Sequence, residues 1–134
     1  MATQVVEQVP TEQVIQGYRT AVTLNPSDAV AQNNLGWGLH FTDMLAEAVV
    51  AFQRALDLDL NLLDAKYGLA LTYKKLNRKE EARAAFENAI KLTDQLEDRF
   101  RARMLRRLAV GHIHEMDTGD WGLSGVARPD LENV

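Results

Sequence analysis

A sequence repeat with a period of 34 residues constrains this chain more than any other feature. Six positions keep the size or type of their residue at this one offset, without a gap: Leu35 and Leu69, Gly36 and Ala70, Leu39 and Tyr73, Ala48 and Ala82, Phe52 and Phe86, and Ala55 and Ala89. A period of this length is typical of stacked helical hairpins, in which no hairpin buries its apolar face alone. The repeat therefore predicts an all-α fold.

Apolar spacing and turn residues predict where the helices lie. A stripe from Val14 to Val22 predicts a helix over residues 11–24, with Thr11 as its N-cap and Asn25-Pro26 as its end. Ser27 or Asp28 is expected to cap the next helix. Further helices are expected at residues 29–41, 45–58, 64–76 and 79–92, with turns at Thr42-Asp43 and Asn77-Arg78. Gly36-Trp37-Gly38 lies inside one of these helices and indicates tight packing rather than a phosphate-binding loop.

The strict period ends after Leu92. The Leu69-Ala70 pair is matched next by Leu108-Ala109, which predicts a five-residue shift and an extra turn or loop around residues 93–98. A last helix is expected from about Arg99 to Glu115. We expect a flexible segment at residues 1–10, a repeat domain at 11–120 and a tail at 121–134, in which Trp121 and Leu123 pack back as a cap.

These residues resemble the tetratricopeptide repeat (TPR) family over residues 11–121. The resemblance rests on Leu35-Gly36, Leu39, Ala48, Phe52 and Ala55 and on their counterparts 34 residues later. It implies a right-handed superhelix of about six helices, with two full repeats flanked by half-repeats. The chain departs from the family at Gln32 and Lys66, where a large aromatic residue is frequent, and at Leu60 and Asp94, where proline is expected.

The resemblance also implies a concave groove that binds an extended peptide or a partner's helix. Nine residues are expected to face the groove, three from each inner helix: Asn33, Trp37 and His40, then Tyr67, Leu71 and Lys74, then Arg103, Arg106 and Arg107. Tryptophan and tyrosine provide rigid anchors, and arginine binds carboxylates with two parallel hydrogen bonds. The alternative is that Trp37 and Tyr67 only pack between repeats.

Some TPR proteins hold the C-terminal carboxylate of heat-shock chaperones with a polar clamp of five residues. Arg103 and Arg107 occupy the positions of its two basic residues in the third helix. Asn33 stands where a lysine is usual, and Trp37 and Gly68 replace two asparagines. We therefore expect no full clamp, but a preference for an acidic or carboxylate-terminated segment.

The arginines of the last helix have a second interpretation. Arg99, Arg103, Arg106 and Arg107 cover about a third of the helix circumference, with Phe100, Met104, Leu105 and Leu108 on the other side. A solvated face that forms salt bridges with Glu80 or with acids near Asp94 is equally compatible with this pattern. Nucleic-acid binding is not expected, because aromatic residues are missing from the stripe.

The implied helix order begins on half of a hairpin. Such a helix exposes an apolar edge unless residues 1–10 or another subunit covers it, which favours self-association. The alternative function is therefore a structural subunit that self-associates or docks into a larger complex through its open helical ends.

Composition excludes several other functions. The chain has no cysteine, so disulfides and thiolate chemistry are excluded. No segment approaches the roughly 20 apolar residues of a membrane span. Net charge is −5 over residues 1–62, +5 over residues 63–110 and −4 over residues 111–134, which indicates a local anion-preferring surface. His112 and His114 point to different helix faces, so no metal site is expected and His112 is expected to be at least half-buried.

Taken together, these patterns predict an adaptor or assembly factor that binds a protein segment. No catalytic residues, cofactor or metal are expected, and the chain is not expected to be an enzyme. The partner is expected to be a protein or peptide, with a homo-oligomer also possible. The first ten residues lack the features of a signal peptide, so a cytoplasmic location is expected.

Overall fold

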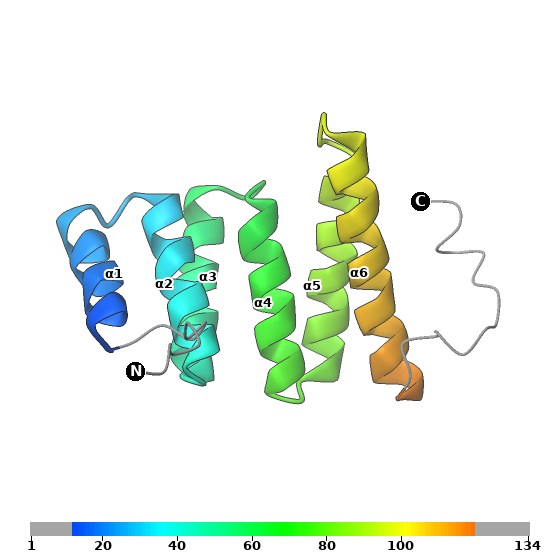
Figure 1. The fold of residues 1–134 in the computed structure, drawn as a ribbon, viewed down its shortest axis with the longest axis horizontal. Coiled ribbons are helices and arrows are strands. Elements are labelled where there is room, and N and C mark those ends of the chain that lie inside the picture. The colour runs from blue at the N-terminus through cyan, green and yellow to red at the C-terminus, as the bar shows by residue number, and fades with distance from the viewer. Residues whose placement is uncertain (1–11, 120–134) are drawn as a thin grey trace, which may run out of the picture. The chain divides into compact units, whose positions relative to one another are not determined.

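The computed structural model describes residues 12–119, which form six α-helices and, within this range, no strand (Figure 1). The chain divides into two compact units, with the boundary between Leu60 and Asn61. The predicted all-α class is confirmed. The expectations for residues 1–10, for Thr11 as a cap and for the tail at 121–134 lie outside the described residues.

The first unit contains α1 (Glu12–Leu24), α2 (Ala29–Phe41) and α3 (Leu45–Leu58). Helix α2 packs against both of the others, and its two glycines make this packing close. A Cβ atom on Gly36 would lie 2.7 Å from the ring of Phe52 on α3, and one on Gly38 would lie 2.8 Å from Ile15 on α1. The tight packing predicted for this segment is therefore confirmed.

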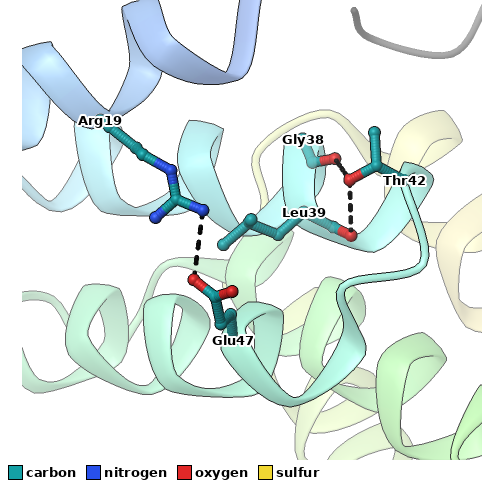
Figure 2. A network of polar contacts seen from close by, with 5 residues as sticks. All are labelled: Arg19, Gly38, Leu39, Thr42 and Glu47. Atoms are coloured by element: carbon teal, nitrogen blue, oxygen red, sulfur yellow. Dashed lines mark hydrogen bonds and ion pairs between the residues drawn. The ribbon is translucent and has the colours of Figure 1, made fainter. Parts of the chain in front are cut away.

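Polar contacts fix the ends of the helices in this unit. Asp28 caps α2 by accepting hydrogen bonds from the backbone N–H groups of Val30 and Ala31. Figure 2 shows the Thr42 hydroxyl donating to the carbonyl oxygens of Gly38 and Leu39 at the other end of α2. It also shows the Arg19 guanidinium of α1, which lies 3.2 Å from the Glu47 carboxylate of α3.

The second unit contains α4 (Leu63–Lys75), α5 (Lys79–Thr93) and α6 (Arg99–Thr118). Helix α5 packs against both α4 and α6 and buries Ala82, Phe86 and Ala89, which continue the apolar pattern of α3. Asp98 caps α6 by accepting from the N–H of Arg101. Helix α6 runs three residues beyond the predicted Glu115 and ends at Gly119, whose φ of 76° suits glycine.

The turn within each unit repeats its geometry at an offset of 34. Asp43 and Asn77 both take the left-handed conformation, with φ of 62° and 61°. The following N–H groups, of Met44 and Arg78, each donate to a carbonyl five residues earlier at 2.9 Å. These are the hydrogen bonds of a helix that ends in a Schellman motif. The predicted turns are confirmed.

The register of α6 differs from the prediction. Ala31 and Gly38 are buried in α2, and Ala65 and Thr72 are buried at the same positions of α4. In α6 the matching buried pair is Ala102 and Ala109, which lies 37 residues after the pair in α4. The shift is therefore three residues, and the predicted shift of five was wrong. Leu108-Ala109 resembles Leu69-Ala70 in residue type, but Ala109 takes the buried position of Thr72.

Candidate functional site

The three candidate residues of α2 lie in an aromatic cluster of the first unit. Asn33 and His40 are buried, and Trp37 is half-buried. The Trp37 ring lies 5.6 Å from that of His40, 5.7 Å from that of Phe41 and 5.4 Å from that of Phe52. These contacts show that α2 uses its candidates largely for packing, with one edge of the indole left accessible.

The candidates of α4 behave in a similar way. Tyr67 is half-buried, and its ring lies 5.9 Å from that of Phe86 and 6.0 Å from that of His112. Burial raises the pKa of Tyr67 to about 12 because it disfavours the charged phenolate. Leu71 is also half-buried.

Lys74, the third candidate of α4, contacts two residues of α6. Its Nζ lies 2.8 Å from Nδ1 of His112 and pairs with the carboxylate of Glu115. Burial, followed by the nearby Lys74 charge, lowers the pKa of His112 to about 4, although the Glu115 charge acts in the opposite direction. His112 is therefore neutral at pH 7, and Nδ1 accepts a hydrogen bond from the lysine, which can only donate.

The half-buried position expected for His112 is thus confirmed, and its ring stacks on Phe86 with centroids 5.0 Å apart. Across residues 12–119, no group of three or more His, Asp or Glu side chains is arranged to hold a metal ion. The cluster of Tyr67, Lys74 and His112 ties α4 to α6.

The arginines of α6 fall into two classes. Arg106 lies 3.6 Å from Asp94, and the Arg99 guanidinium donates to the carbonyls of Thr93 and Leu96 in the loop before α6. Arg103 and Arg107 are exposed and make no ion pair with any residue in the described part of the chain. The salt-bridge interpretation therefore applies to Arg106, and such an exposed pair contributes little stability.

The revised register explains why these arginines are exposed. With a shift of three residues, Arg106 and Arg107 occupy the positions of Leu69 and Ala70, which are buried in α4. The positions of Tyr67 and Leu71 are taken by Met104 and Leu108. Helix α6 thus carries arginine where the preceding hairpin carries apolar residues, as expected for a terminal helix with a solvated outer face.

Sequence reasoning missed an exposed apolar stripe on α6. Phe100, Met104 and Leu108 are spaced by one helical turn and are 70%, 49% and 41% exposed. With Arg103 and Arg107 they lie within about 140° of the helix circumference. We call these five residues the α6 surface. The sequence signal for it was present in the spacing, but we expected packing to cover the apolar side.

Comparison with known proteins agrees with this architecture. Residues 63–95 match the family model of the tetratricopeptide repeat. The peroxisomal targeting signal receptor of Kluyveromyces lactis is 31% identical over 78 residues, and that of Candida glabrata is 29% identical over 83 residues. These matches cover 58% and 62% of this chain but only 14% of each receptor, so the chain spans about one seventh of the length of these curated relatives.

Solved structures show the same fold. The crystal structure of MamA has a TM-score of 0.61 and 28% identity, over 77% of this chain and 55% of that chain. PcrH, solved in complex with the chaperone binding region of PopD, has a TM-score of 0.71 and 15% identity, over 78% of this chain and 77% of that chain. The last of these likenesses concerns the fold alone.

None of the helices in the described range is both long and apolar enough to cross a membrane. The repeat period, the glycine-lined hairpin, the repeated turns and the family match at residues 63–95 agree with one another. The chain belongs to the tetratricopeptide repeat family.

Proposed function

We propose that this chain is a protein-interaction scaffold whose α6 surface binds an acidic or carboxylate-terminated protein segment that also carries apolar side chains. The observation that carries the proposal is the α6 surface itself. There, three exposed apolar side chains lie beside Arg103 and Arg107, two arginines that pair with no described carboxylate.

The chemistry of this surface defines its ligand. An apolar stripe on one helix face accepts the apolar residues of an amphipathic segment, and burying them drives association. The two guanidinium groups at its edge bind carboxylates in a bidentate manner. A partner that offers only one of these features would leave the other half of the surface unused.

The comparisons support a binding role at a coarser level. Proteins of this family are typically interaction modules without catalytic activity. The two curated relatives are named as receptors of a targeting signal. PcrH shows that a chain with this fold can be crystallised with a segment of a partner protein. The acidic and apolar preference is our proposal from the α6 surface alone.

The test is a synthetic peptide array in which acidic and apolar residues are varied independently. We expect binding only where both are present. For a peptide so selected, charge reversal by Arg103→Glu with Arg107→Glu should weaken binding at least about tenfold and reduce its dependence on salt, because exposed charges are screened by ions. Met104→Ala should also weaken binding, with little change in salt dependence.

Lys79→Glu with Lys91→Glu is the matched control, since it changes net charge equally on α5 of the same unit. If that variant loses as much affinity as the arginine variant, binding follows overall charge and the α6 surface is not the site. Unchanged affinity after Arg103 and Arg107 are reversed would contradict the proposal directly.

A further inference from the structure

Helix α1 carries two apolar stripes, and only one of them packs on α2. Ile15 and Tyr18 contact Gly38 of α2. The other stripe, Val14, Gly17, Ala21 and Leu24, is exposed, with Val14 at 41% and Leu24 at 81%. We call these four residues the α1 stripe. Its spacing of three and four residues keeps it on one face of the helix.

The repeat shows that the α1 stripe occupies positions that are buried elsewhere. At an offset of 34, its first three residues correspond to Ala48, Ala51 and Ala55 of α3, which are 0%, 2% and 0% exposed. The same positions are therefore covered in a helix that has neighbours on both sides. In α1 they retain an apolar character but remain exposed.

The charge around the α1 stripe suits contact with an identical helix. From Gln13 to Leu24 the one charged residue is Arg19, and its guanidinium is paired with Glu47 of α3 (Figure 2). The hydroxyls of Thr20 and Thr23 donate to the carbonyls of Gln16 and Arg19 at 2.9 Å, so these side chains are already satisfied within the helix. The arginine-rich α6, in contrast, would repel a second α6.

The order of residue sizes in the α1 stripe is symmetric about position 19. In an antiparallel pair of α1 helices, Val14 meets Leu24 of the second copy and Gly17 meets Ala21 of the second copy. The small residues then lie at the centre, where helix axes approach most closely. A Cβ atom added to Gly17 would meet nothing within 4 Å, so this space is open to a partner.

We propose that two copies of this chain associate through their α1 stripes as a two-fold symmetric, antiparallel helix pair. A two-fold interface uses the same patch on both subunits, which the symmetric order of sizes satisfies. Because a single helix face gives an interface at the small end of the usual range, the dimer should be reversible and dependent on concentration.

Sedimentation of the full chain over a range of concentrations tests the proposal. We expect a monomer–dimer equilibrium that Ala21→Glu weakens about tenfold or more, because an unpaired carboxylate would become buried in the contact. Gln16→Glu adds the same charge on the opposite side of α1, so it is the matched control and should leave the dimer unchanged.

Introduced cysteines test the geometry, since the chain contains none of its own. In the antiparallel pair, residue 17 lies opposite residue 21 of the second copy, whereas two copies of residue 17 are offset by about 6 Å along the helix axis. A mixture of Gly17→Cys and Ala21→Cys chains should therefore oxidise mainly to the mixed disulfide. Preferential formation of the two homodimeric disulfides would overturn the antiparallel arrangement.

A chain that stays monomeric at every concentration would overturn the proposal. So would a chain that dimerises only after residues 1–11 are removed, because that result would mean that its own first residues cover the α1 stripe. Equal loss of the dimer in Ala21→Glu and Gln16→Glu would also contradict it. Peptide binding at the α6 surface should be unaffected by Ala21→Glu, so the two proposals can fail separately.

Discussion

At the scale of single residues, two glycines of the first unit lie in opposite surroundings. A Cβ atom on Gly36 would lie 2.7 Å from the Phe52 ring, which is completely buried and has no room to move away. A Cβ atom on Gly17 would meet nothing within 4 Å. The same substitution should therefore have opposite effects on stability.

We expect Gly36→Ala to lower the free energy of unfolding by about 1 kcal/mol, because overpacking exceeds the gain in helix propensity. Gly17→Ala should raise it by about 0.5–1 kcal/mol. Chemical denaturation at low protein concentration measures both without a contribution from self-association. A stabilised Gly36→Ala variant would show that the contact with Phe52 is less restrictive than the structure indicates.

His112 provides a prediction that depends on pH. Its pKa in the folded chain is about 4, below the ordinary value of 6.5, because of burial and the adjacent Lys74 charge, with Tyr67 and Glu115 also facing the ring. The unfolded chain therefore binds a proton more readily between these two values. Stability contributed by neutral His112 is present above pH 6.5 and is lost as the pH falls toward 4.

His112→Phe removes this titration and preserves the ring stacked on Phe86. Between pH 7 and pH 5 we expect the wild-type chain to lose about 1 kcal/mol more of its unfolding free energy than the variant, a reduced figure because the ring is only half-buried. Denaturation curves at several pH values measure the difference. Parallel pH profiles for the two chains would rule out His112 as its source.

At the scale of elements, the turns are as periodic as the helices. Asp43 and Asn77 share the same conformation and the same following hydrogen bond, because a helix that reverses in three residues needs one residue with positive φ. Aspartate and asparagine tolerate this conformation better than other residues with a side chain.

Substitutions at Asn77 test this requirement. Asn77→Gly should leave stability unchanged or raise it slightly, whereas Asn77→Val should lower the unfolding free energy by about 1–2 kcal/mol because valine is strained at positive φ. Asn88→Val is the control, since Asn88 is exposed in the middle of α5. Thermal unfolding of the three variants should show the loss only at position 77.

Helix α6 shows how an element can be located correctly and oriented wrongly. Its start at Arg99 was predicted from the spacing, and its identity as a third inner helix is consistent with its buried alanines. Its rotation depends on how many residues the preceding loop inserts. Residue type alone matched Leu108-Ala109 to the earlier Leu-Ala pair, whereas packing against α5 placed Ala102 and Ala109 inward.

At the scale of the whole molecule, charge and exposed apolar surface divide between the two units. Residues 1–62 carry a net charge of −5 and residues 63–110 a net charge of +5. The first unit presents an apolar stripe that is nearly free of charge, and the second presents an apolar stripe beside arginines. An acidic partner would therefore favour the second unit, and the first is left to bind a copy of itself.

The sequence by itself determined the helices, their turns and the family. These features depend on local spacing and on residue size, which the 34-residue period displays directly in pairs such as Phe52 and Phe86. Tertiary structure decided which sides of the terminal helices remain exposed. That property depends on whether a neighbouring helix covers a given face, so only packing could separate the exposed Met104 and Leu108 from the buried Ala102 and Ala109.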